Sequence, residues 1–119
     1  MVNKNLLIHL MDNKKKTLLL DGAVGSLLIN RGFKPDINLW TSYLNIEKPD
    51  SVLAIHKEYI SAGADIITTN TFRTNPAAKK KSNISITNTE LVNRSVEIAK
   101  KARNDHEVLI AGSNAPAED

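Results

Sequence analysis

The sequence predicts an α/β fold with a parallel sheet, because three short apolar runs alternate with helical segments. The runs are TLLLDG at residues 17–22, ADIITTN at 64–70 and EVLIAGSN at 107–114. Strands that are covered on both faces have such near-continuous apolar runs, whereas half-exposed strands alternate. The order strand, helix, strand with buried strands is typical of a parallel sheet with right-handed crossovers.

The first long helix is expected from about Pro49 to Ala62. Proline suits the first helical position, because the N–H that it lacks has no helical partner there. Gly63 then ends the helix, since glycine adopts the left-handed conformation at little cost. The apolar stripe of this helix has spacings of three and four and comprises Val52, Ile55, Tyr59 and Ala62.

The second long helix is expected from about Asn88 to Arg103. Thr87 and Glu90 have the spacing of a capping box, in which each side chain satisfies a backbone N–H of the first turn. The expected inward stripe comprises Val92, Val96, Ala99 and Ala102.

The composition is that of an ordinary globular domain of 119 residues, with 41% hydrophobic residues, 24% charged residues and a net charge of +3. We expect one domain over 1–119, in which a leading helix within 1–16 precedes three strands and their helices over 17–119. The apolar side of the leading helix carries Leu6, Leu7 and Leu10.

Several classes of partner are not expected from this composition. The lysine runs at 14–16 and 79–81 have no interleaved aromatic residues, so nucleic acid is not an expected partner. No apolar run reaches the length of a membrane span. The sequence contains no cysteine, which excludes disulfides and thiolate ligands within the chain and fits a cytoplasmic location.

Polar residues follow each predicted strand at its carboxyl end. They are Asp21-Gly22, Thr69-Asn70-Thr71 and Gly112-Ser113-Asn114. Parallel strands bring these ends to one rim of the sheet, where ligands of α/β proteins bind. Three strands do not close a barrel, so we also expect open sheet edges through which copies of the chain can associate.

Five motifs carry a family resemblance: LLLDGAVGSLL, RGF, Leu39-Trp40, EKPDSVLAIHKEYISAGADIITTNTF and AGSNAPAED. In this order and spacing they resemble the N-terminal part of the homocysteine S-methyltransferase family. This family of zinc-dependent barrels includes betaine–homocysteine methyltransferase and the homocysteine domain of cobalamin-dependent methionine synthase. The resemblance implies the N-terminal part, about three β/α units, of a (β/α)8 TIM barrel with parallel strands.

The resemblance also implies the reaction, which is transfer of a methyl group to the sulfur of L-homocysteine to give methionine. In the family, three cysteines hold a zinc ion that keeps the substrate thiol as a nucleophilic thiolate. Those cysteines lie in the later half of the barrel, and none is present here. We therefore expect an N-terminal fragment that has no catalytic or metal residue of its own and is inactive alone.

The resemblance assigns the substrate-binding positions to the predicted rim. Asp21 and Gly22 match the pair that contacts the amino-acid end of homocysteine, and Thr69 matches a position that binds its carboxylate. Asn70 is included as a further substrate-binding candidate. Taken alone, each of these residues also fits a turn or a strand–loop junction.

Trp40 and Phe72 match positions of the methyl-donor pocket, where an aromatic face suits a cationic donor. For both residues the alternative of a packing anchor stays open. His56 matches the family pattern but lies on an outer helix, which favours a packed histidine with its hydrogen bonds satisfied. The donors used among relatives are S-methylmethionine, S-adenosylmethionine, betaine and a methylated folate or corrinoid, and the sequence does not choose between them.

Two other hypotheses remain. The chain can be a non-catalytic binding or assembly module whose open edges are covered by a partner chain. It can also belong to another barrel enzyme that uses the same rim for a phosphate or amide ligand, although no glycine-rich phosphate loop is present.

Overall fold

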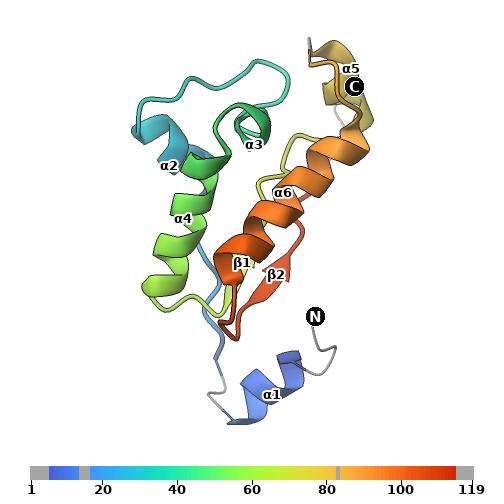
Figure 1. Cartoon of the computed structure of the whole chain (residues 1–119). Helices are drawn as coiled ribbons and strands as arrows, with labels where there is room; N and C mark the ends of the chain where they lie inside the picture. Colours follow the sequence, from blue (N-terminus) through green and yellow to red (C-terminus); the bar gives the residue numbers. More distant parts are fainter. Residues whose placement is uncertain (1–5, 14–16, 83, 115–119) are drawn as a thin grey trace.

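The computed structural model describes residues 6–13, 17–82 and 84–114, and Figure 1 shows the arrangement of their elements. The helices are α1 (Leu6–Asn13), α2 (Gly25–Asn30), α3 (Leu44–Glu47), α4 (Pro49–Ser61), α5 (Pro76–Lys81) and α6 (Asn88–Arg103). The strands are β1 (Ile66–Thr68) and β2 (Leu109–Ala111). None of the described helices is long and apolar enough to cross a membrane.

The sheet is parallel, as the sequence predicts. β1 pairs with β2 in parallel, with Ile66 opposite Leu109 and Thr68 opposite Ala111. The predicted strand at 17–22 runs beside β1 on its other side, where Leu20 forms an isolated parallel bridge with Ile66. The backbone N–H of Asp21 also donates to the carbonyl of Ile66 at 2.8 Å. Segment 17–22, β1 and β2 therefore lie in this order across the sheet.

The prediction that 17–22 is a buried regular strand is wrong for this structure. Leu19 and Leu20 are 53% and 58% exposed, and the segment makes a single bridge instead of a ladder. It has a hydrogen-bonded neighbour on one side only, and the described part of the chain does not cover these two side chains. Apolar runs of this kind become regular buried strands only when both faces are covered.

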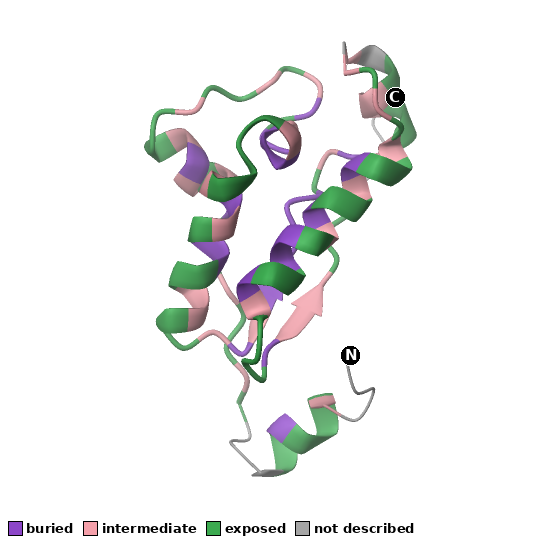
Figure 2. Ribbon diagram, viewed as in Figure 1, coloured by how far each residue is buried: buried purple, intermediate pink, exposed green. Residues whose placement is uncertain are grey.

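Helices α4 and α6 pack against each other and cover one face of the sheet, where the buried residues gather in Figure 2. Val52 and Ile55 of α4 are fully buried, as predicted. Tyr59 is half-buried, and Ala62 lies exposed beyond the end of the helix. The core at the sheet is formed by Ile67 of β1, Ala99 of α6 and Val108, which directly precedes β2.

The inward stripe of α6 differs from the predicted one. Val92 and Val96 are only half-buried, while the buried residues are Leu91, Ser95, Ile98, Ala99 and Ala102. Ala99 and Ala102 are buried as predicted, whereas the first half of the stripe is shifted by one position, from Val92 and Val96 to Leu91 and Ser95. The larger Leu91 and Ile98 take the centre of the contact, because α6 packs against α3 and α4 as well as against the sheet.

The predicted helix ends are confirmed. Pro49 begins α4, and Gly63 follows it with φ of 107°. The hydroxyl of Thr87 accepts a hydrogen bond from the backbone N–H of Glu90 at 3.1 Å at the start of α6. In the leading helix α1, Leu10 is buried but Leu7 is 44% exposed, so the predicted apolar side is only partly used.

Candidate functional site

A cleft of about 440 Å³ lies at the carboxyl ends of the strands. It contains all six residues that the sequence assigns to substrate or donor binding: Asp21, Gly22, Trp40, Thr69, Asn70 and Phe72. These residues come from three separate parts of the chain. The parallel bridge between Leu20 and Ile66 brings the first and third parts together, and the hydrogen bonds between Thr41 and Asn70 hold the loop of Trp40 beside them. The structure therefore places the predicted rim residues around one cavity.

Asp21 is held by the end of β1. Its carboxylate accepts a hydrogen bond from the backbone N–H of Thr68 at 2.9 Å and bonds from the Thr68 hydroxyl at 3.1 and 3.2 Å. Burial raises the pKa of Asp21 above its usual value, and the bonds from Thr68 partly offset this rise. Among the described residues that line the cleft, Asp21 alone is charged, so the cleft attracts cations.

Gly22 allows a close approach to helix α4. A Cβ atom at this position would lie 2.7 Å from the hydroxyl oxygen of Tyr59, which is too close for a non-bonded contact. That hydroxyl donates to the carbonyl of Ala23 at 2.8 Å, so it is fixed in place. Gly22 therefore has a packing reason for being glycine, in addition to its position on the cleft.

Thr69 and Thr71 connect β1 to the end of β2. The Thr71 hydroxyl donates to the carbonyl of Ser113 at 2.6 Å, so its hydrogen is used there. The Thr69 hydroxyl lies 2.8 Å from that of Thr71 and therefore donates to it. It also accepts the backbone N–H of Ser113 at 3.3 Å. In this arrangement, Thr69 binds a carboxylate only if its proton turns away from Thr71.

Asn70 uses its side chain inside the protein. The amide donates to the carbonyl of Thr41 at 3.0 Å and to Oδ1 of Asn45 at 3.2 Å. Its Oδ1 accepts from the Thr41 hydroxyl at 3.1 Å. Both amide protons of Asn70 are therefore engaged within the protein, and direct contact between Asn70 and substrate stays a prediction.

Trp40 and Phe72 are the aromatic residues of the cleft, and they are 38% and 49% exposed. Trp40 has φ of 55°, and its backbone pairs with that of Asp36 through bonds of 2.8 and 3.0 Å. A Cβ atom at Gly25 would lie 2.4 Å from Nε1 of Trp40, so the indole packs tightly on the start of α2. Both aromatic rings remain partly open to a ligand.

Sequence reasoning missed two polar residues that shape the cleft. Thr68 was passed over in favour of Thr69, although β1 has Ile67 pointing into the core and its neighbours must face the other side. The role of Thr41 could not be predicted from neighbouring residues, because it depends on a contact with Asn70, which lies 29 positions away in the sequence.

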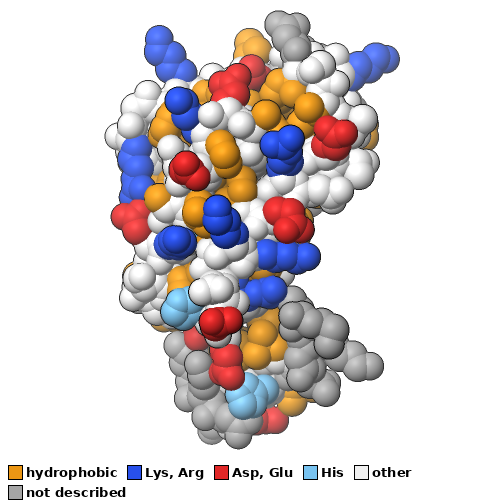
Figure 3. Space-filling view, in the orientation of Figure 1, with side chains coloured by type: hydrophobic (Ala, Val, Ile, Leu, Met, Phe, Trp, Pro, Cys, Tyr) orange, Lys and Arg blue, Asp and Glu red, His pale blue; other side chains and the backbone are white. Residues whose placement is uncertain are grey.

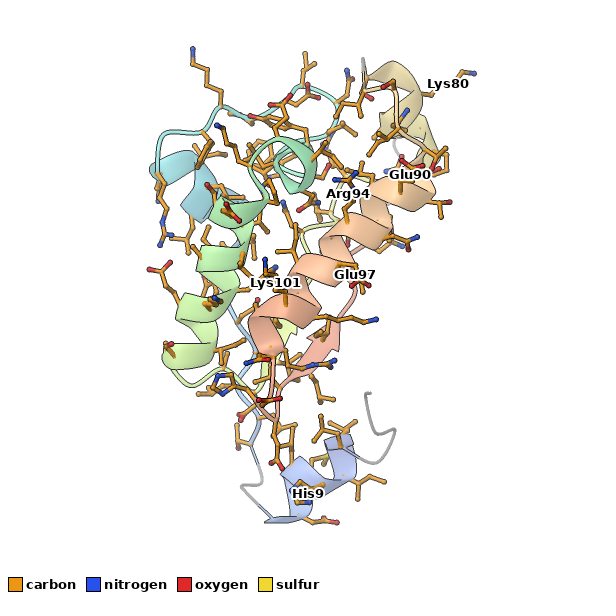
Figure 4. The ribbon with its side chains drawn as sticks, viewed as in Figure 1. His9, Lys80, Glu90, Arg94, Glu97 and Lys101 are labelled. Carbon is orange, nitrogen blue, oxygen red and sulfur yellow. The ribbon has the colours of Figure 1, made fainter. Side chains whose placement is uncertain are left out.

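A larger hollow, of about 530 Å³, lies on the outer surface beside α6. Figure 4 labels four of its residues, which are Glu90, Arg94, Glu97 and Lys101. These charges alternate in sign along the helix, and Figure 3 shows charges of both signs spread over this face. This pattern is typical of a solvated helix surface. The smaller cleft on the rim is therefore the better candidate for the functional site.

The described residues do not fit a zinc site. No group of three histidine, cysteine or acidic side chains among them is placed to hold a metal ion. The whole sequence also lacks cysteine, which is the ligand implied by the family resemblance. Zinc would therefore have to be held by residues outside this chain.

His56 differs from the packed and satisfied histidine that was expected. It is fully buried on α4, and neither ring nitrogen has a hydrogen-bond partner among the residues that the structure describes. Burial lowers the pKa of His56 from 6.5 to about 4. This histidine is neutral at physiological pH and does not line the cleft.

The parallel pairing and the polar cleft at the carboxyl ends of the strands define this chain as an α/β unit with a candidate ligand site on its rim. The homocysteine S-methyltransferase family model matches residues 18–119. The chain belongs to the homocysteine S-methyltransferase family. The predicted fold class, the N-terminal part of the barrel of this family, is confirmed.

Individual relatives agree with this assignment. The chain is 32% identical to homocysteine S-methyltransferase of Escherichia coli K12, over 98% of this chain and 40% of that protein. It is 28% identical to homocysteine S-methyltransferase YbgG of Bacillus subtilis, over 85% of this chain and 32% of that protein. The metallated form of the E. coli homocysteine methyltransferase MmuM matches with a TM-score of 0.79 and 34% identity, over 94% of this chain and 42% of that one. The chain thus spans less than half the length of these relatives.

Proposed function

We propose that the protein containing this chain transfers a methyl group to the sulfur of L-homocysteine and so forms methionine. Within that protein, the chain supplies the part of the site that binds the amino-acid end of homocysteine. Family membership over residues 18–119 supports the reaction. The observation that carries the chain's role is the carboxylate of Asp21, held by Thr68 in a cleft that has no other charged residue among those described.

The chemistry of the cleft fits an amino acid that carries an ammonium group. Asp21 offers carboxylate oxygens to the cleft, and a charge-assisted bond from an ammonium group is stronger than a neutral one. The rise in the pKa of Asp21 on burial is reversed when a cation approaches, because an opposite charge favours the ionised form. Ligand binding therefore stabilises the carboxylate in its charged state.

Trp40 and Phe72 are proposed to form the wall of the methyl-donor site. Their partly exposed rings present apolar faces that suit a cationic sulfonium or ammonium donor. Zinc activation of the homocysteine thiol, if the protein uses it, depends on ligands outside this chain. A cytoplasmic location stays a prediction from the sequence.

The proposal is tested with a chimera in which this chain replaces the matched segment of the E. coli homocysteine S-methyltransferase. We expect the chimera to form methionine from homocysteine and S-methylmethionine. Asp21→Asn should abolish most of this activity through a higher KM for homocysteine, whereas Asp105→Asn changes an exposed carboxylate and should leave it intact. A folded chimera that loads zinc but forms no methionine would contradict the proposal.

A second candidate function is that of an assembly module completed by a partner chain. The exposed Leu19 and Leu20 and the single-sided pairing of β2 favour it. Analytical ultracentrifugation of the chain alone distinguishes the two. A stable oligomer with protected β2 amides supports the module, and a monomer that gains activity only in the chimera supports the enzyme.

A further inference from the structure

We infer that Asn70 is a positioning residue, which fixes Trp40 at the wall of the cleft through a buried cluster with Thr41 and Asn45. These three residues, Thr41, Asn45 and Asn70, are called the Asn70 cluster below. The contacts stand on the structure alone. The assignment of Trp40 to the wall of the methyl-donor site rests on the proposed function.

The first step is the double contact between Asn70 and Thr41. The Asn70 amide donates to the Thr41 carbonyl at 3.0 Å, and the Thr41 hydroxyl donates to Oδ1 of Asn70 at 3.1 Å. The Asn70 side chain thus bonds to both the backbone carbonyl and the hydroxyl of Thr41, which is the residue that follows Trp40. This contact fixes the position and the orientation of that peptide unit.

The second step is the support that Asn45 gives from helix α3. Its amide donates to the Asn70 carbonyl at 2.8 Å, and its Oδ1 accepts from the Asn70 amide at 3.2 Å. Thr41, Asn45 and Asn70 are 0%, 1% and 5% exposed. A buried donor without a partner lowers the stability of the fold. The three side chains of the Asn70 cluster are therefore kept in the one arrangement that pairs their donors.

The third step is that Trp40 needs such support. Its φ of 55° lies in the left-handed region, which bulky residues rarely adopt without help from their surroundings. Its indole packs on Gly25 so closely that a Cβ atom there would overlap Nε1. The Asn70 cluster holds the next residue, and the pairing with Asp36 holds the backbone of Trp40 itself.

The cluster therefore joins the two sides of the cleft. Asn70 follows the end of β1, close in sequence to Thr69 and Phe72, while Thr41 belongs to the loop that carries Trp40. A shift of that loop would change the spacing between Trp40 and the rest of the lining. Through Thr41, Asn70 thus acts on the position of Trp40 in addition to lining the cleft itself.

Trp40 is the only tryptophan in the chain, so its fluorescence reports this position directly. We would measure the emission maximum and acrylamide quenching of the full chain and its variants. Thr41→Val removes the hydroxyl but keeps the volume, and Asn70→Asp removes the amide donor. Both should shift the emission to the red and increase quenching, while far-UV circular dichroism stays native.

Three further variants make the result specific. Thr41→Ser keeps the hydroxyl and should restore the wild-type emission. Asn93→Asp changes an exposed residue of α6 and should also leave the emission unchanged. Gly25→Ala displaces the indole by direct overlap and calibrates the size of the fluorescence change.

Three outcomes would overturn the inference. One is wild-type emission from a natively folded Thr41→Val variant. Another is unfolding of Thr41→Val under conditions in which Gly25→Ala stays folded, because the cluster would then support the whole fold and not Trp40. The third is a wild-type emission equal to that of the urea-unfolded chain. None of these measurements depends on methyltransferase activity, so they fail or succeed separately from the proposed function.

Discussion

The buried His56 should make the stability of the chain depend on pH in a defined window. Within the described part of the chain neither ring nitrogen has a hydrogen-bond partner, and burial lowers the pKa of His56 from 6.5 to about 4. Between these two values the unfolded chain binds a proton that the folded chain excludes. Stability from this group is therefore fully present above pH 6.5 and is lost as the pH falls toward 4.

The size of the effect follows from the two pKa values. The gap between 6.5 and about 4 is worth about 3 kcal/mol of unfolding free energy, since one pH unit corresponds to roughly 1.4 kcal/mol. His56→Leu removes the titrating group and the two unpaired nitrogens while keeping an apolar side chain in the core. Between pH 7 and pH 4, the unfolding free energy of this variant should fall by about 3 kcal/mol less than that of the wild type.

The assay is urea denaturation followed by circular dichroism at a series of pH values. His106→Gln is the matched control, because it replaces an exposed histidine, and it should keep the wild-type pH dependence. Equal pH dependence in His56→Leu and the wild type would refute the reasoning. It would show that the imidazole finds a partner or a proton in the folded state.

Two further predictions concern single hydrogen bonds. Thr68→Val removes the hydroxyl that lowers the pKa of Asp21, so an NMR titration of the Asp21 carboxyl should give a higher pKa than in the wild type, with Thr68→Ser close to the wild type. An unchanged pKa in Thr68→Val would show that the hydroxyl has no effect and that burial and the backbone N–H of Thr68 set the pKa of Asp21. Thr87→Ala removes the N-cap of α6 and should cost about 1 kcal/mol in a urea titration, whereas an unchanged midpoint would mean that the cap is replaced by water.

The helix ends could be predicted from the sequence because they depend on neighbouring residues. Pro49, Gly63 and Thr87 each act within one turn of the chain, through ring geometry, backbone conformation or a side-chain cap. The structure places all three at the expected ends. The parallel pairing of β1 and β2 also followed from the helix between them.

Burial was harder to predict because it depends on what lies on the other side of an element. The apolar run at 17–22 has the pattern of a buried strand, yet Leu20 is 58% exposed. On α6, two apolar stripes fit the helical period, and packing against α3 selected the one with Leu91 and Ile98. The sequence pattern alone does not show which of the two stripes of α6 faces the core.

The position of the candidate site on the rim could be predicted from the sequence, but the hydrogen bonds made by each side chain could not. Parallel strands fix the rim, so Asp21 and Thr69 were placed correctly beside one cleft. Which polar residue faces inward depends on the loops that pack around it. Asn70 is engaged by Thr41 and Asn45, while Thr68, which was not singled out, holds Asp21.

The central claim is that the carboxylate of Asp21 recognises the amino group of homocysteine. The most direct test compares methyl transfer in the chimera to homocysteine and to 4-mercaptobutyrate, which has the same thiol and carboxylate but no amino group. The account predicts that the unmutated chimera strongly prefers homocysteine in kcat/KM and that Asp21→Asn loses most of this preference. An Asp21→Asn chimera that keeps the full preference would contradict the account, because another group would then bind the ammonium.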